Sequence, residues 1–292
     1  MPIKSKSHAA MADIYTSLAV FLGDDVAKAI SQIAEIADFE MSDAANEPFV
    51  KFTEWINSRP GFIDAWRSDP VLERKFYMRL MSGVEAARDG YRAAVYHLER
   101  LREMEDQLYA VLAEFDFSNS IPPNSVMAIG NTRRWSFEYQ AFVIDYRRAL
   151  DGLAWGLSTY FKVEQSSFKQ FAKTLPKYRP AVVSVALASA CARHMEHFAF
   201  VIGTERGRSV RDRIAHRESV QAGCINVGAF GFRIVGGGED LGISDFNDRR
   251  RLADVLEARL LTLHVCLADQ LKTLQDAVTA HEADTIGSNA SD

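Results

Sequence analysis

Five arginines and one histidine gather within residues 204–217, a combination that suits phosphate chemistry. Arg211 precedes His216 by five positions in this stretch. Arginine is a permanent cation whose planar fork matches a phosphate group. Histidine exchanges protons near neutral pH without further activation. Together they are the side chains that metal-free cleavage of RNA requires. The alternative is a basic helix end, where cations interact favourably with the negative pole of the helix dipole.

Cleavage of RNA by its own 2′-hydroxyl needs a base, an acid and neutralisation of charge at phosphorus. His216 gives each chain one proton-transfer group, so two chains that meet motif to motif across a twofold axis would supply both. Arg211 from each chain would clamp the phosphate. Four further arginines would steer the RNA backbone or form a solvated basic face: Arg206, Arg208, Arg213 and Arg217.

The spacing within this motif sets a geometric condition. Arg211 and His216 lie about 140° apart around an ideal helix. Both can reach one phosphate only if the helix ends near Ala215, or if they flank a groove. Asp212 is four residues from His216, so the two side chains can face each other on a helix. A carboxylate there would raise the pKa of the imidazole and fix its tautomer, or the two would form a structural pair.

Other candidate groups are less complete. His194 and His197 stand three residues apart and could bind a metal ion, but the sequence places no third ligand beside them. Cys224 lacks a histidine or carboxylate partner at a recognisable spacing. The glycines at 236–238 lack the Gly-Lys-Ser/Thr of a phosphate loop and indicate a turn. The sequence therefore predicts no metal and no cofactor.

The composition indicates a globular protein without a membrane segment. The 292 residues are 48% hydrophobic and 25% charged, with a formal net charge of -5, which argues against a protein that coats nucleic acid non-specifically. Three widely spaced cysteines without a CxxC pattern predict reduced thiols. No signal sequence or membrane span is apparent. We therefore expect a cytoplasmic location.

Helical periodicity dominates the elements that would position the motif. Apolar residues at three- and four-residue steps predict helices at 14–37, about 72–115, 135–160, 181–202 and 252–278. The second is too long for one small core and must pair with a helix of its own or a second chain. Residues 116–134 are expected to form a loop. Alternation at 225–234 predicts a β-hairpin within about 220–238, and Ser244 or Asp245 is the expected N-cap of the last helix.

The segment Arg211-Asp212-Arg213-Ile214-Ala215-His216 resembles the motif of the HEPN superfamily, an arginine and a polar residue followed, after three residues, by a histidine. The helix at 142–154 is similar to a core helix of bacterial proteins of this type, and a hairpin follows the motif in similar proteins. The resemblance covers about residues 70–282. It implies an all-α, HEPN-like helical bundle with long helices, and a homodimer that forms the site. Many active members carry Asn where this chain has Asp212.

We predict three segments: a helical appendage at 1–69, the HEPN-like bundle at 70–283 with its hairpin, and a disordered tail at 284–292. The predicted function is that of a metal-independent endoribonuclease, a toxin or defence effector with RNA as substrate and an antitoxin or other protein as a further partner. Its catalytic residues would be Arg211, Asp212 and His216. The alternative is a catalytically silent HEPN-like module that binds RNA, a nucleotide or a protein. A third hypothesis is a helical scaffold.

Overall fold

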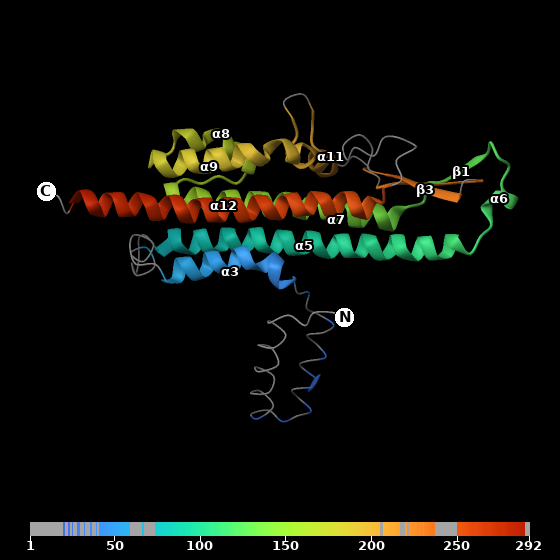
Figure 1. Ribbon diagram of the computed structural model, residues 1–292, viewed down its shortest axis with the longest axis horizontal. Coiled ribbons are helices and arrows are strands. Elements are labelled where there is room, and N and C mark those ends of the chain that lie inside the picture. Colours follow the sequence, from blue (N-terminus) through green and yellow to red (C-terminus); the bar gives the residue numbers. More distant parts are fainter. Residues whose placement is uncertain are drawn as a thin grey trace.

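The computed structural model describes residues 41–58, 66, 74–204, 207–216, 220, 222–229, 231–236 and 250–289, together with isolated positions before residue 41. The chain is predominantly helical, as the periodicity predicts. Three long helices run side by side along the molecule: α5 (Arg74–Ala113), α7 (Arg133–Ser158) and α12 (Leu252–Asn289) (Figure 1). The expected first helix at 14–37 lies outside the described residues, apart from single positions.

Shorter elements cover the three long helices. Helix α3 (Asp43–Ser58) packs along α5 and α12 on one side, and α8 (Phe168–Thr174) and α9 (Ala181–His194) lie on the other (Figure 1). The expected helix at 181–202 is broken into α9, a 3-10 turn η3 (Met195–Phe198) and α10 (Ala199–Ile202). The remaining short helical elements are α6 (Phe117–Ser120), η1 (Thr159–Phe161), η2 (Leu175–Lys177) and α11 (Val210–Ala215).

The partner of the long helix α5 belongs to the same chain. Its apolar stripe is buried against α7 and α12, and glycines let the α5 and α7 backbones touch. A Cβ atom placed on Gly83 would lie 2.3 Å from the Cα atom of Gly156, and one on Gly90 would lie 2.6 Å from the backbone nitrogen of Ala149. Real Cβ atoms do not approach other atoms this closely, so only glycine permits this helix–helix distance.

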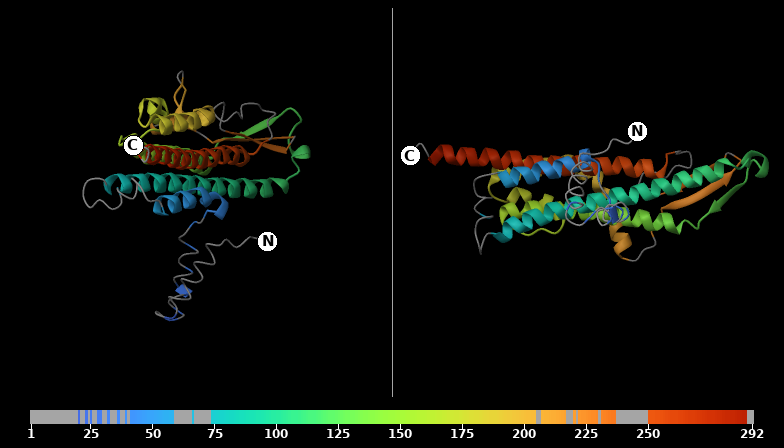
Figure 2. Two further views of the ribbon diagram at one scale, coloured as in Figure 1. Left: turned by 60° about the vertical axis from the view of Figure 1, so that its left-hand side comes forward. Right: turned by 90° about the horizontal axis from the view of Figure 1, so that it is seen from below.

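A three-stranded antiparallel sheet lies at the end of the bundle where α5 ends and α7 begins (Figures 1 and 2). The predicted hairpin is confirmed as β2 (Gly223–Gly228) and β3 (Gly231–Gly236), with Gly228 opposite Gly231. The expectation of a loop throughout 116–134 is wrong, because β1 (Val126–Ile129) pairs with β2. All four β1 side chains are exposed. The strand therefore lacks the alternation of buried and exposed residues by which a strand is recognised in a sequence.

Helix α12 begins beside a buried carboxylate of α5. The Glu105 side chain accepts hydrogen bonds from the backbone nitrogens of Leu252 and Ala253, at 3.0 and 3.2 Å. Burial raises the pKa of Glu105, although these hydrogen bonds and Arg251 act in the opposite direction. Arg251, a cation at an unfavourable helix end, forms an ion pair with Asp106. The expected N-cap at Ser244 or Asp245 lies outside the described residues. In the described part of α12, the first backbone nitrogens are capped by Glu105, a distant residue of the same chain.

The core does not stop at residue 70. Phe49, Phe52 and Ile56 of α3 are each 1% exposed and belong to the same hydrophobic cluster as the three long helices. The cluster therefore includes part of the predicted 1–69 appendage. At the other end α12 extends to Asn289, into the 284–292 segment that we expected to be disordered.

Candidate functional site

The basic motif lies on α11, a helix of six residues. The Ser209 hydroxyl caps its first turn by accepting a hydrogen bond from the backbone nitrogen of Asp212 at 3.0 Å. Val210 is fully buried and Ile214 is partly buried against the core, four residues apart on one face. These two anchors hold the helix by one side, against α7 and α10. The opposite side is left to the polar residues of the motif.

The chain reaches α11 through a tight connection after α10. Gly203 has a φ of 70°, and a Cβ atom at this position would lie 2.9 Å from the Gly207 carbonyl oxygen. That carbonyl accepts a hydrogen bond from the Thr204 backbone nitrogen. Arg147 of α7 donates to the Val201 carbonyl at 3.2 Å and to Asp151 at 2.7 Å, which secures α10 on α7. The start of the motif is therefore fixed by backbone geometry as well as by packing.

The segment after the motif is laid along the first turns of α7 by three hydrogen bonds. The Gln140 amide donates to the Val220 carbonyl at 2.8 Å, the Ala222 nitrogen donates to the Ser136 hydroxyl at 3.2 Å, and the Thr132 hydroxyl donates to the Gly223 carbonyl at 2.6 Å. Ser136 and Gln140 of α7 and its N-cap residue Thr132 recur every four positions, so they lie along one side of the helix start. The segment therefore runs antiparallel to α7, from the motif back to the helix start.

The helix of the motif ends near Ala215, as one of the two geometric conditions required. Helix α11 ends at Ala215, and His216 is its C-cap residue with a non-helical ψ of 16°. Both Arg211 and His216 are exposed. The His216 backbone nitrogen still donates to the Asp212 carbonyl at 2.9 Å, so the chain leaves the helical path only after His216. The two side chains that could bind and protonate a phosphodiester are thus accessible on the outer side of one short helix.

Asp212 is engaged by other partners than the one expected. Its side chain lies 3.3 Å from Nη1 of Arg211, and within the described chain no hydrogen bond or ion pair joins it to His216. Partial burial would raise the pKa of Asp212, but hydrogen bonds from Ser209 and Arg211 outweigh this effect and lower it. The expected pairing of Asp212 with His216 is therefore wrong. The carboxylate serves the start of the helix, where negative charge is favourable, rather than its end.

The other basic residues divide into two groups. Arg208 is exposed and Arg213 is half-buried, and both take part in interactions within the protein. Arg206 and Arg217 lie outside the described residues. The structure therefore places Arg208, Arg211, Arg213 and His216 on one short segment.

His194 and His197, the two histidines considered as metal ligands, make other contacts in the structure. His194 Nε2 lies 2.8 Å from Oδ2 of Asp269, and Arg193 donates to both oxygens of the same carboxylate. His197 is exposed and lies 3.9 Å from its neighbour Glu196. Where the structure describes side chains, it contains no group of histidine, cysteine and carboxylate residues that could hold a metal ion. His194 links α9 to α12 as part of the framework.

A cluster that the sequence analysis missed joins α5 to α7. His97 lies between two carboxylates, with its Nδ1 atom 2.6 Å from Glu138 and its Nε2 atom 3.4 Å from Asp145. Arg148 also approaches Asp145, at 3.7 Å. The hydrogen bond to Asp145 is the largest cause that raises the pKa of His97, and Glu138 adds to it against the effect of burial. His97 is far in sequence from Glu138 and Asp145, so only the pairing of α5 with α7 reveals the cluster.

We expect this cluster to make stability depend on pH. A histidine whose pKa is raised by folding contributes stability below its ordinary value of 6.5, and this contribution is lost as the pH rises through the folded pKa. His97→Gln should therefore flatten the decline of the free energy of unfolding above pH 6.5. Urea unfolding at a series of pH values measures this. An unchanged slope in His97→Gln would show that the cluster does not control stability.

Comparisons with known proteins assign no function to this chain, so any function must be argued from its own site. No protein-family model matches the chain, and no curated protein or solved structure does so either. The fold defines a predominantly helical protein with a small antiparallel sheet, and the candidate site is an exposed arginine–histidine helix end. Of the helices within the described residues, none combines the length and apolar character needed to cross a membrane.

Proposed function

We propose that the protein is a metal-independent endoribonuclease of HEPN type, a toxin or defence effector that cleaves RNA at a homodimer interface. The observation that carries this proposal is the exposure of both Arg211 and His216 on one short helix, α11, whose other side is anchored in the core. Exposure is necessary, because a site shared by two chains requires each motif to be reachable by its copy and by RNA.

The proposed reaction needs no group beyond the two motifs and the RNA. One His216 accepts the proton of the 2′-hydroxyl, and the 2′-oxygen attacks phosphorus. The bond from phosphorus to the 5′-oxygen breaks, and the His216 of the other chain gives that oxygen a proton. Arg211 from both chains neutralises charge on the phosphoryl oxygens. The products are a 2′,3′-cyclic phosphate and a 5′-hydroxyl. The other arginines of the motif would contact the RNA backbone.

The experiment that tests the proposal is incubation of the purified protein with a single-stranded RNA in excess EDTA, followed by analysis of the product ends. We expect cleavage that leaves 2′,3′-cyclic phosphate and 5′-hydroxyl ends, and light scattering that gives the mass of a dimer. Products with 5′-phosphate ends, or loss of activity in EDTA, would contradict this mechanism. A monomer at micromolar concentration would leave the reaction without its second proton-transfer group.

The second candidate is a catalytically silent HEPN-like module that binds RNA, a nucleotide or a protein partner, and one observation favours its protein-binding form. Arg211 already contacts the Asp212 carboxylate at 3.3 Å, so phosphate must compete with an internal anion. The two side chains are 44% and 38% exposed, and ion pairs at such surface positions contribute only about 0–1 kcal/mol. RNA binding without cleavage by the same protein would support this second candidate over the first.

A further inference from the structure

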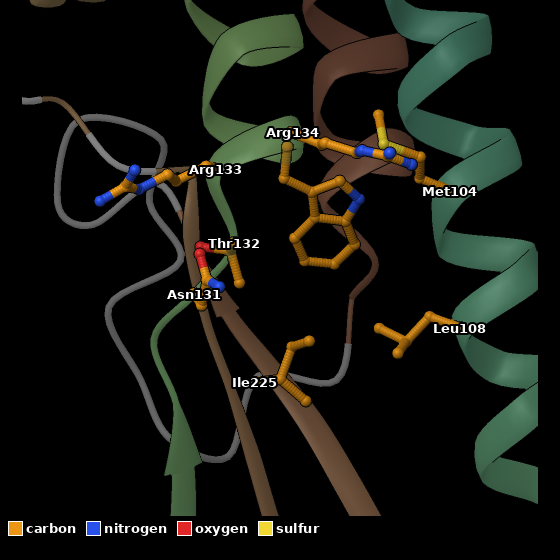
Figure 3. Close-up of a pocket in the computed structure, with 8 residues that line it drawn as sticks. Met104, Leu108, Asn131, Thr132, Arg133, Arg134 and Ile225 are labelled. Carbon is orange, nitrogen blue, oxygen red and sulfur yellow. The ribbon is translucent and has the colours of Figure 1, made fainter.

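A cavity of about 380 Å³ opens where α5, the start of α7 and β2 meet. Figure 3 shows Leu108 and Ile225 on facing walls, with Arg134 reaching over the opening toward Met104 and Arg133 extending to the other side. Trp135 is 5% exposed and also lines the cavity. Ligand pockets in proteins occupy roughly 300–1,000 Å³, so this cavity suits a small molecule or one unit of a polymer.

The walls combine an apolar floor with positive charge at the mouth. Trp135, Leu108, Ile225 and Met104 offer a surface against which a planar ring can pack. Arg133 and Arg134 are both exposed, and neither has an ion-pair partner among the described residues. An arginine without an internal partner at the rim of an apolar pocket is suited to bind an anionic group of a ligand that the floor holds.

The start of α7 adds donors to the same rim. The Thr132 hydroxyl donates to the Gly223 carbonyl and makes no cap hydrogen bond to its own helix. The first backbone N–H groups of an α-helix have no partner within the helix. The backbone at the mouth of the cavity therefore reinforces the charge of the two arginines, and it does so beside the apolar floor.

The cavity is also connected to the motif. Its wall residue Ile225 lies on β2, which begins seven positions after His216 in the chain. Between them, Val220, Ala222 and Gly223 are held at the start of α7, because Gln140 and Thr132 donate to the Val220 and Gly223 carbonyls and the Ala222 nitrogen donates to the Ser136 hydroxyl. The motif precedes this segment and the cavity follows it, so both lie along the amino-terminal part of α7. A strand of RNA that joins α11 to the cavity would pass over Val220 and Ala222, which cover this part of α7.

We propose that this cavity binds one nucleoside monophosphate unit, with its base against Trp135 and Leu108 and its phosphate on Arg134. The unit is either a free mononucleotide or one unpaired nucleotide of a single-stranded RNA. The second source rests on the proposed ribonuclease function, because it makes the cavity a subsite of the RNA substrate. An unpaired base is required, since a base within a duplex cannot leave its stack without cost.

The test is calorimetric titration with UMP, AMP, inorganic phosphate and a short single-stranded RNA. His216→Ala protein is used for the RNA, so that cleavage does not interfere. Arg134→Ala removes the proposed phosphate contact, and Leu108→Trp fills the cavity. Arg148→Ala is the matched control, because Arg148 is an exposed arginine on the same helix, outside the cavity lining. We expect Arg134→Ala to weaken mononucleotide binding about ten- to a hundredfold, Leu108→Trp to abolish it, and Arg148→Ala to leave it unchanged.

The outcomes separate this proposal from the proposed function. Mononucleotide binding that depends on Arg134, in a protein that never cleaves RNA, supports the cavity and contradicts the nuclease. Cleavage by a protein whose Arg134→Ala and Leu108→Trp variants bind mononucleotide and RNA like the wild type overturns the cavity proposal alone. Inorganic phosphate that binds as tightly as UMP and AMP overturns it as well, because the apolar floor would then contribute nothing. Tighter binding of RNA than of either mononucleotide identifies the polymer as the source.

Discussion

Replacing His216 with alanine should abolish RNA cleavage and leave the fold intact. General acid–base catalysis contributes about 10²–10⁴-fold per proton transfer, and a homodimer of the variant loses both groups at once. The residue is exposed and follows the last residue of α11, so its side chain supports no packing in the core. Substitutions at such positions change stability by less than about 0.5 kcal/mol. Initial rates of RNA cleavage in EDTA and thermal melting, compared with the wild type, measure both effects.

The matched control is His197→Ala, at another exposed histidine outside the motif. This variant should cleave RNA at the wild-type rate, so that a loss confined to His216→Ala is attributable to the motif. Equal cleavage by the wild type and His216→Ala would remove His216 from the mechanism. A large drop in melting temperature would instead show that His216 supports the fold.

The candidate site was visible in the sequence because its residues are contiguous. Arg211 and His216 are five positions apart, and residue types at a fixed spacing are what a sequence displays. The end of the helix between them was not visible, because it depends on the cap at Ser209 and on the burial of Val210 and Ile214. The contact of Asp212 with Arg211 instead of His216 was not visible either, because it too depends on how the start of α11 is capped and packed.

The helices were predicted more completely than the contacts between them. Apolar periodicity predicts α5, α7 and α12 because each buries a continuous stripe. The link between His97 and the Glu138 and Asp145 side chains was missed, since it joins residues far apart in the chain. Glu105 was missed for the same reason, because it caps a helix that begins 147 positions later. Strand β1 depends on its register against β2 and on no pattern of its own.

The cavity beside the start of α7 illustrates the same limit at a binding site. Arg133 and Arg134 are adjacent in the sequence, and a pair of arginines before an aromatic helix is usually a solvated helix end. Only the approach of Leu108 and Ile225 from two other elements converts this helix end into a lined cavity. One recurrent signal was present, since Thr132, Ser136 and Gln140 are polar residues at four-residue steps in and just before the aromatic-rich first turns of α7. Such a stripe predicts a polar segment seated on the helix.

Gly83→Ala is expected to cause the largest loss of stability among conservative substitutions in the bundle. The new Cβ atom would lie 2.3 and 2.4 Å from the Cα and backbone nitrogen of Gly156. These are backbone atoms, so relief requires α5 and α7 to move apart along their long shared contact. Overpacking of this kind costs about 3 kcal/mol, against which alanine regains at most about 1 kcal/mol of helix propensity. A cost of 1 kcal/mol lowers the melting temperature by about 2–4 °C in a domain of 150–250 residues.

The control is Gly130→Ala, the same substitution in open space, where an added Cβ atom meets nothing within 4 Å. Differential scanning calorimetry of both variants and the wild type should show a loss of roughly 4–8 °C for Gly83→Ala, from a net cost of about 2 kcal/mol, and little change for Gly130→Ala. Equal melting of all three proteins would mean that α5 and α7 do not touch through their glycines. In that case the two helices would stand farther apart, and the His97 contacts to Glu138 and Asp145, which bridge the same pair of helices, would have to lengthen with them.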